Sequence, residues 1–240
     1  MRIGNVSYLN SFPFRFGLKS SCDDEINTYV PSEIASRLED GFIDIGLVPL
    51  ASFLQHKNWH IISDYCIGAE GAVKTVLLIS KKPIHKIQSI CYDTDSRSSN
   101  MLTKVLAANY WKITPFEANV NDADARVMIG DKAFADYSDA YPYTFDLAQE
   151  WFDFQKLPFV FAVWVSNKEL MPVDLKRINE MMKFGVNHIE ESLNYFSENL
   201  PVPPNEALSY LKDNISFLLD SNKRLAIKQF EELASNSGLI

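Results

Sequence analysis

The chain has 240 residues, of which 47% are hydrophobic, 12% aromatic and 22% charged. This length and composition exclude wholesale disorder and suit one large folded domain or two small lobes. With 23 basic and 31 acidic residues the net charge is −8, and no basic stripe appears in the sequence. Nucleic-acid binding is therefore not expected, because phosphate contacts need clustered Lys and Arg.

Membrane insertion, export and metal binding also lack support in the sequence. Apolar stretches such as Phe159–Val165 are far shorter than the roughly 18 residues that a membrane span needs. The N-terminal residues resemble a first strand and not an export signal, so we expect a cytoplasmic protein. Cys22, Cys66 and Cys91 have no CxxC spacing, which is typical of reduced thiols, and no metal site is predicted.

The first fifty residues predict a βαβ unit. Arg2–Leu9 predicts a first strand and Ile26–Val30 a second. Pro31 opens a helix that stops at Gly41, because Gly readily adopts a left-handed backbone. A buried strand over Phe42–Val48 follows. The segments after the first and third strands should therefore meet at one carboxyl edge of a parallel sheet, where open α/β sheets bind ligands.

Two similar segments, Thr75–Lys82 and Phe159–Lys168, each predict an apolar strand that runs into a Lys-bearing turn. We interpret them as two crossings between lobes. The block between them has its own predicted strands at Ser89–Tyr92 and Arg126–Ile129 and an amphipathic helix at about Ser99–Asn109. This block is therefore predicted to form a second lobe inserted into the first.

The C-terminal third predicts helices, including Asn205–Lys212 and Lys223–Ser235, which we expect to cover the first sheet. Residues 1–80 and 161–240 would form a discontinuous first lobe, and residues 81–160 the inserted second lobe. The expected fold class is α/β: two mixed sheets flanked by helices, joined by two crossing strands, with a cleft between the lobes. This is a hinged, two-lobed binding fold.

Polar residues at strand ends are the first candidates for a site. Asn10 and Ser11 follow the first strand, and Val48 and Pro49 end the third, so all four should border the cleft and contact a ligand. A side-chain amide there can orient a polar ligand, whereas Asn after a strand is more often a turn residue.

The hydroxyl-rich segment Asp93–Asn100 follows a strand and opens a helix. Helix starts of this kind bind anions through free N–H groups, and Ser is equally a good helix cap, so both interpretations stay open. Asp93 and Asp95 weaken the anion interpretation unless they point away from the ligand.

Several other residues lie where the expected fold could bring them to the cleft. Glu70 and Thr75, with Lys74 between them, lie where the chain enters the first crossing. Asp131 ends a strand of the second lobe, where helix capping is favoured over ligand contact. Histidine is the commonest general base. The four histidines show no ligand spacing and are expected in surface loops or, for the last, in a long helix: His56, His60, His85 and His188.

Seven short segments carry a specific order and spacing between Arg2 and Lys168: Val6–Pro13, Asp44–Pro49, Asp64–Gly71, Ser96–Ser99, Val127–Asp131, Asp146–Trp151 and Pro158–Trp164. Together they resemble the chorismate dehydratase family of the futalosine route to menaquinone. The resemblance implies a fold like the type II periplasmic binding proteins. It also implies a cytoplasmic hydro-lyase without a cofactor, which removes water from chorismate to give 3-[(1-carboxyvinyl)oxy]benzoate.

The resemblance also implies roles for residues. Similar enzymes use an Asn at the position of Asn10 and a hydroxyl residue, more often Ser, at that of Thr75. Arg97 would pair with a carboxylate or face solvent. The lack of a cleft histidine favours the enolpyruvyl carboxylate of the substrate as the base, with Glu70 as the rival. Three serines, in a motif that usually reads Ser-Arg-Thr-Ser, would donate to a substrate carboxylate: Ser96, Ser98 and Ser99.

Two alternatives stay open. The first is a non-catalytic small-anion binding or sensory module of the same fold, which would hold its ligand without turnover. The second is the related 1,4-dihydroxy-6-naphthoate synthase, which relies on a His base, and no histidine here has a convincing cleft position. The expected partner is the small dicarboxylate chorismate, with no nucleic acid and no membrane, for a monomer or a homodimer.

Overall fold

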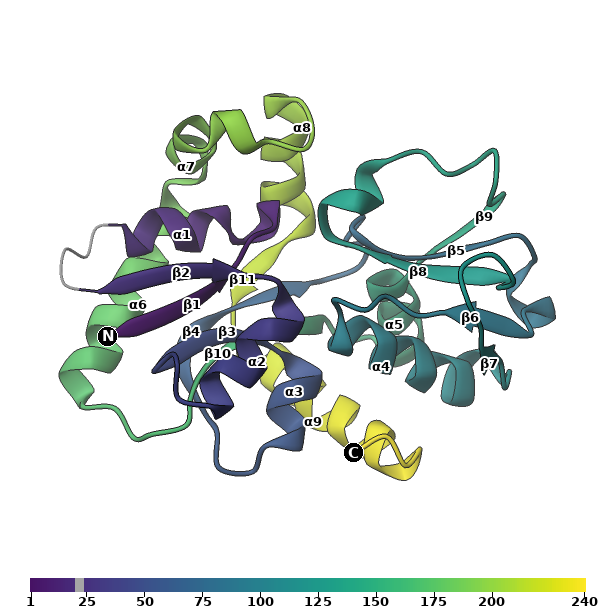
Figure 1. The fold of residues 1–240 in the computed structure, drawn as a ribbon, viewed down its shortest axis with the longest axis horizontal. Coiled ribbons are helices and arrows are strands. Elements are labelled where there is room, and N and C mark those ends of the chain that lie inside the picture. Colours follow the sequence, from purple (N-terminus) through teal and green to yellow (C-terminus); the bar gives the residue numbers. More distant parts are fainter. Residues whose placement is uncertain (20–23) are drawn as a thin grey trace. The chain divides into compact units, whose positions relative to one another are not determined.

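A computed structural model describes residues 1–19 and 24–240, so Cys22 lies outside the described residues. The described chain forms two compact units (Figure 1). The first comprises Met1–Gly68 and Val160–Asp220, and the second comprises Ala69–Phe159 and Ser221–Ile240. Each unit contains a mixed β-sheet flanked by helices, so the predicted α/β class is confirmed. No helix in these two described ranges has the length and apolar character that a membrane crossing requires.

The six-stranded sheet of the first unit has the order β11-β4-β10-β3-β1-β2. Its strands are β1 (Arg2–Val6), β2 (Glu25–Tyr29), β3 (Ile45–Pro49), β4 (His60–Ala69), β10 (Phe159–Ser166) and β11 (Ser216–Leu218). Strand β1 runs parallel to both β2 and β3, whereas β10 is antiparallel to β3. Helix α2 (Pro31–Glu39) connects β2 to β3. The predicted βαβ unit is therefore confirmed.

Helix α2 packs closely on one face of this sheet because two strand positions lack a side chain. A Cβ on Gly4 would lie 3.5 Å from Cγ2 of Ile34 on α2 and 2.6 Å from Cδ1 of Ile43, which follows α2. A Cβ on Gly46 would lie 2.7 Å from Cγ2 of Ile34. Trp164 of β10 points to the opposite face, because its neighbour Val165 pairs with Gly46.

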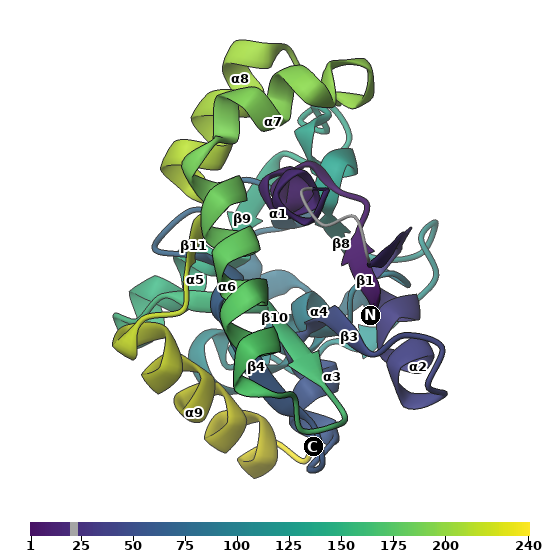
Figure 2. The same cartoon turned by 90° about the vertical axis from the view of Figure 1, so that its left-hand side faces the viewer.

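Helix α1 (Phe12–Leu18), which the sequence analysis did not predict, covers that opposite face. Its Phe14 ring meets Trp164 edge-on, with 5.8 Å between ring centroids. Figure 2 shows α1 beside α6 (Pro172–Asn187). The two helices approach closely, since a Cβ on Gly185 would collide with the main-chain oxygen of Pro13. The other helices of this unit are α3 (Leu50–Gln55), α7 (Ile189–Tyr195) and α8 (Pro204–Ser209).

The second unit has a five-stranded sheet with the order β7-β6-β8-β5-β9. Its strands are β5 (Val76–Ser80), β6 (Ser89–Cys91), β7 (Phe116–Glu117), β8 (Ala125–Ile129) and β9 (Tyr143–Asp146). Strand β6 is parallel to β7 and β8, and β5 is antiparallel to β8 and β9. The helices are α4 (Arg97–Leu106), α5 (Leu147–Gln155) and α9 (Ser221–Asn236).

The compact units differ from the predicted lobes in two segments. Thr75–Lys82 does not connect the units, because β5 is hydrogen-bonded on both sides within the second sheet. The chain enters the second unit at Ala69, at the end of β4, a strand that the sequence analysis did not predict. Helix α9, expected to cover the first sheet, belongs instead to the second unit. Its Phe230 ring lies 5.7 Å from that of Trp151.

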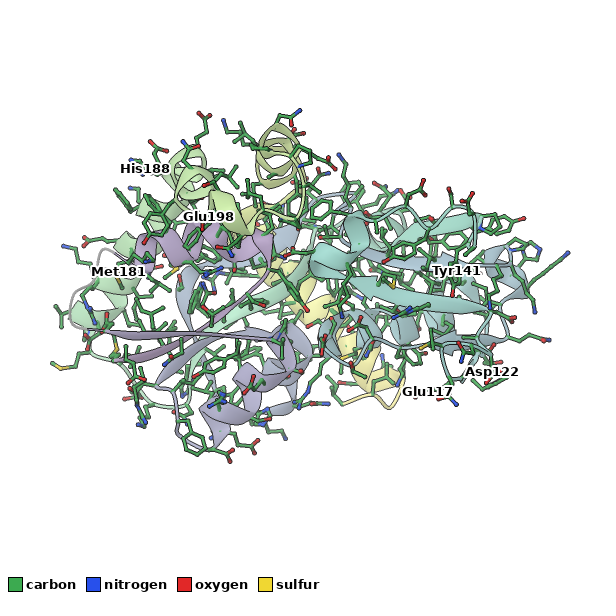
Figure 3. All side chains as sticks on the ribbon, turned by 45° about the horizontal axis from the view of Figure 1, so that its top comes forward. Glu117, Asp122, Tyr141, Met181, His188 and Glu198 are labelled. Carbon is green, nitrogen blue, oxygen red and sulfur yellow. The ribbon has the colours of Figure 1, made fainter. Side chains whose placement is uncertain are left out.

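Three predicted boundaries are also corrected. The first strand ends at Val6, not Leu9, because the chain turns into a 3-10 helix over Leu9–Ser11. The third strand begins at Ile45, since the main-chain N–H groups of Phe42 and Ile43 both donate to Arg37 at the end of α2. His188, predicted inside one long helix, lies between α6 and α7 (Figure 3).

Candidate functional site

The carboxyl edge of the first sheet carries the first group of predicted site residues. Because β1 and β3 are parallel neighbours, the segments that follow Val6 and Pro49 start from the same edge. The sequence-based prediction that these two segments share an edge is therefore confirmed. Asn10 and Ser11 lie in the turn that follows β1, and Pro49 leads directly into α3.

Ser11 and Asn10 differ in what their side chains contact. The buried Ser11 hydroxyl lies 2.6 Å from the carbonyl oxygen of Val6 and 2.8 Å from that of Tyr8, which fixes the turn after β1. The partly exposed Asn10 amide makes no hydrogen bond within the described chain. Ser11 thus shapes the turn, and the amide of Asn10 is available to a ligand.

Val48 and Pro49 are buried at the end of β3. They pair with Val163 and Ala162 of β10 in the antiparallel register. Their side chains are apolar, so they offer a ligand at this edge a rigid apolar surface and main-chain polar groups, and no charged group.

Asn5, which precedes the last residue of β1, is a further candidate that was not among the predicted site residues. Its side chain is fully buried, its Oδ1 accepts a hydrogen bond of 2.8 Å from the N–H of Val6, and its Nδ2 has no partner among the described residues. The sequence signal for Asn5 is a polar residue within an otherwise apolar strand. Because buried polar groups are nearly always hydrogen-bonded, the unpartnered Nδ2 of Asn5 makes it a candidate for contact with a ligand.

One edge of the second sheet gathers most of the remaining predicted residues. Helix α4 follows β6, and Asp131 follows β8, which is parallel to β6. Strand β5 begins at the same edge, because Val76 pairs with Ile129 in the antiparallel register. Thr75, the start of α4 and Asp131 therefore lie at one edge, and the N–H of Gly130 donates to the carbonyl oxygen of Thr75 at 2.9 Å.

The serines at the start of α4 form a connected, buried cluster. The Ser96 hydroxyl accepts from the N–H of Ser99 at 3.2 Å, which is the predicted helix cap, and donates to the Ser99 hydroxyl at 2.7 Å. Because a hydroxyl carries one donor proton, the proton of Ser99 remains available to a ligand. Ser98 is equally buried, at 2% exposure. Capping and anion binding are therefore compatible at this helix start.

The two aspartates that weakened the anion interpretation are engaged elsewhere. Asp93 accepts a hydrogen bond of 2.8 Å from the N–H of Asp95, and the Asn100 amide bonds both main-chain groups of Asp93. The Asp95 carboxylate pairs with Lys132 at 3.2 Å. Their charges are thus partly compensated within the loop.

Arg97 and Asp131 occupy different positions at this edge. Arg97 is exposed at the first position of α4. Asp131 is half-buried within a 3-10 helix over Gly130–Phe134, whose N-cap is Ile129. The expectation that Asp131 caps the next helix is therefore wrong, because that helix begins at Gly130 and its N-cap is Ile129.

Thr75 and Glu70 contrast in their surroundings. Thr75 is buried, with 1% exposure, directly before β5. Glu70 is exposed in the turn after β4, and its carboxylate makes no hydrogen bond or ion pair within the described chain. A buried hydroxyl has a fixed direction, whereas an exposed carboxylate is surrounded by water.

The histidines lie outside both edges. The His56 ring stacks on Trp59 at 3.9 Å, His60 begins β4, and His85 lies in a short 3-10 helix. Nδ1 of His188 lies 2.7 Å from the carbonyl oxygen of Phe184. Within the described residues, no group of three His, Cys, Asp or Glu side chains is arranged to hold a metal ion.

Curated relatives match most of the chain. A chorismate dehydratase of Thermus thermophilus is 26% identical over 228 residues, which is 85% of this chain and 84% of the relative. A chorismate dehydratase of Campylobacter jejuni is 26% identical over 239 residues, or 96% of each chain.

Solved structures share the fold at lower identity. A protein of Archaeoglobus fulgidus superposes with a TM-score of 0.77 and 13% identity, covering 100% of this chain and 98% of its own. The alkanesulfonate-binding protein of Xanthomonas axonopodis superposes with a TM-score of 0.67 and 15% identity, covering 100% and 93%. The expected periplasmic-binding-protein-like fold is therefore confirmed. The family model described as menaquinone biosynthesis matches residues 1–236, and the chain belongs to this menaquinone biosynthesis family.

Proposed function

We propose that this protein is a chorismate dehydratase, a hydro-lyase that converts chorismate into 3-[(1-carboxyvinyl)oxy]benzoate. The observation that carries the proposal is the near full-length match to relatives of that name, which covers 84% and 96% of their chains. The buried serines and helix N-terminus at one edge of the second sheet add support, because such donors suit a substrate carboxylate. Cytoplasmic location and a monomer or homodimer stay predictions.

The dehydration of chorismate is driven by formation of an aromatic ring. The proton that is lost lies on a ring carbon conjugated through the diene to the ring carboxylate, so its removal gives a delocalised anion. Expulsion of the neighbouring hydroxyl then completes the loss of one water and leaves an aromatic ring. Because aromatisation drives the reaction, we propose that no cofactor is needed. The protein holds two carboxylates, orients the ring and stabilises developing charge with fixed donors.

The residue roles follow from these needs. The unengaged amide of Asn10 and the buried hydroxyl of Thr75 orient the enolpyruvyl carboxylate, which itself takes the ring proton. The Ser99 hydroxyl, which accepts from Ser96, donates to the other carboxylate together with the N–H groups that open α4. Ser98, Arg97 and Asp131 lie at the same edge and line the bound substrate.

The direct test is to mix the purified protein with chorismate, without added metal or cofactor. We expect a product lighter by one water with an aromatic ultraviolet spectrum, followed by mass spectrometry and absorbance. Chorismate that binds but is recovered unchanged would support the binding-module alternative. If chorismate neither binds nor reacts, the proposed substrate is wrong.

The identity of the base can be tested with Glu70→Gln. Because Glu70 is exposed and has no partner within the described chain, we expect kcat to stay within about three-fold of the unchanged protein, whereas losing a general base costs about 10²–10⁴-fold. The matched control is Glu117→Gln, an exposed carboxylate on β7 in the same unit (Figure 3). A loss of 10²-fold confined to Glu70→Gln would make Glu70 the base.

A further inference from the structure

The Asp146 carboxylate accepts hydrogen bonds from two segments of the second unit, the start of α5 and the turn before β5. It ends β9 and caps α5, where its Oδ1 accepts hydrogen bonds from the N–H groups of Ala148 at 3.0 Å and Gln149 at 3.2 Å. Its Oδ2 accepts from the N–H of Lys74 at 2.6 Å, and the N–H of Val73 also donates to the carboxylate. Burial raises the pKa of Asp146, against the opposing effect of these four N–H donors.

The segment that Asp146 holds has an unfavourable backbone. Lys74 has φ = +66°, the left-handed region that disfavours residues with a Cβ. Gly71, three residues earlier, has φ = +85°, and a Cβ there would lie 3.2 Å from Oε1 of Gln149 on α5. The start of α5 thus packs on the turn Gly71–Lys74. Such strain persists only where surrounding contacts fix it, and it concentrates at functional sites.

The strained residue directly precedes Thr75. On the other side, Thr75 is anchored by the N–H of Gly130, which donates to its carbonyl oxygen, and by the pairing of Val76 with Ile129. The direction of the Thr75 side chain therefore depends on the backbone angles of Lys74, which the Asp146 carboxylate holds.

We propose that Asp146 is a positioning residue for the dehydration reaction: by holding Lys74 in its left-handed conformation, it aims the Thr75 hydroxyl at the substrate. This inference rests on the proposed function, because it assumes that Thr75 acts on chorismate. It assigns Asp146 an action through the main chain and no contact with the substrate.

We call the hydrogen bond from the N–H of Lys74 to the Asp146 carboxylate the clamp. The test separates the effect of losing this clamp from the effect of losing the helix cap. In Asp146→Ser the single hydroxyl still caps α5, because Ser is a good N-cap, but one oxygen cannot also bond Lys74. Lys74→Gly removes the conformational penalty, because Gly adopts positive φ readily. The matched control is Asp124→Ser at the opposite edge of the same sheet, where Asp124 accepts from the N–H of Gln88 at 2.9 Å and pairs with Lys82 at 2.7 Å.

For Asp146→Ser we expect kcat to fall by about 10²-fold while KM changes by less than about three-fold, since misplacement by 1 Å can cost that much in rate. Lys74→Gly combined with Asp146→Ser should recover at least about ten-fold of the loss in Asp146→Ser, because Gly adopts positive φ readily. Asp124→Ser should lose stability without loss of kcat. Unchanged kcat in Asp146→Ser, or a loss that Lys74→Gly does not recover, would overturn the proposal.

Amide hydrogen exchange of residues 70–76 provides a readout without substrate. We expect faster exchange in Asp146→Ser than in the unchanged protein and in Asp124→Ser, because exchange reports local opening. Equal exchange in Asp146→Ser and the unchanged protein would show that Asp146 does not hold this segment, and would overturn the proposal. If the unchanged protein does not convert chorismate while this exchange difference is present, the proposed function fails and the clamp stands.

Discussion

Asn10→Ala is expected to lower kcat/KM for chorismate by about 10²-fold, because a reacting carboxylate that is misplaced by 1 Å can cost that much in rate. The Asn10 amide has no hydrogen-bond partner within the described chain, so its removal should leave the turn after β1 intact. That turn is held instead by the Ser11 hydroxyl. Steady-state kinetics with purified protein, followed by the aromatic absorbance of the product, would measure the effect.

The control for this change is Asn27→Ala in β2 of the same sheet. The Asn27 amide donates to the exposed Glu25 carboxylate at 2.9 Å, so we expect little change in activity or melting temperature. If Asn10→Ala and Asn27→Ala are equally active, Asn10 has no role in catalysis. Equal melting temperatures would show that any loss in Asn10→Ala is not a loss of folding.

Thr75→Val and Thr75→Ser form the second pair with a large expected difference. Val keeps the shape of Thr but lacks the hydroxyl, and we expect its kcat to fall by about 10²-fold or more if the hydroxyl orients the carboxylate. Ser keeps the hydroxyl and should retain activity to within about ten-fold, since it lacks only the methyl group that restricts the rotamer. The two variants are compared by kcat, KM and melting temperature.

The contrast between the two variants decides the interpretation. Thr75 is 1% exposed, so both substitutions alter a packed position. If Val and Ser lose activity equally, the effect is one of packing and the hydroxyl has no catalytic role. If Thr75→Val is as active as the unchanged protein, Thr75 has no role in the reaction.

Patterns of neighbouring residues were sufficient to predict several elements of the fold. Pro31 at a helix start and Gly41 with φ = +73° are encoded within a dozen residues, and both were predicted. The Ser96 cap depends on a hydroxyl and an N–H three residues apart, which the chain brings together wherever that helix forms. The common direction of β2 and β3, which both run parallel to β1, follows from the helix α2 that connects them.

Other elements were not predictable because they depend on partners distant in the sequence. The short helix α1 follows a turn that the Ser11 hydroxyl closes on β1, and it packs closely against Gly185 of α6. Strand β4 alternates too weakly to be distinguished from a loop, and its assignment comes from its hydrogen-bonded neighbours β10 and β11. The sequence marks Asn5 as a polar residue in an apolar strand, but only the structure shows that its side chain is fully buried and that its Nδ2 has no partner among the described residues.

The sequence by itself determined the α/β class, the βαβ unit and the residues that can carry chemistry, because these depend on side-chain type and on periodicity over a few turns. Tertiary structure alone decided that Thr75, the serines of α4 and Asp131 share one sheet edge, since strand order and register join segments up to 56 residues apart, Thr75 to Asp131. It also placed α9 with the second unit, through the contact of Phe230 with Trp151. Such choices depend on which apolar surfaces fit together over the whole fold, and no local pattern records that fit.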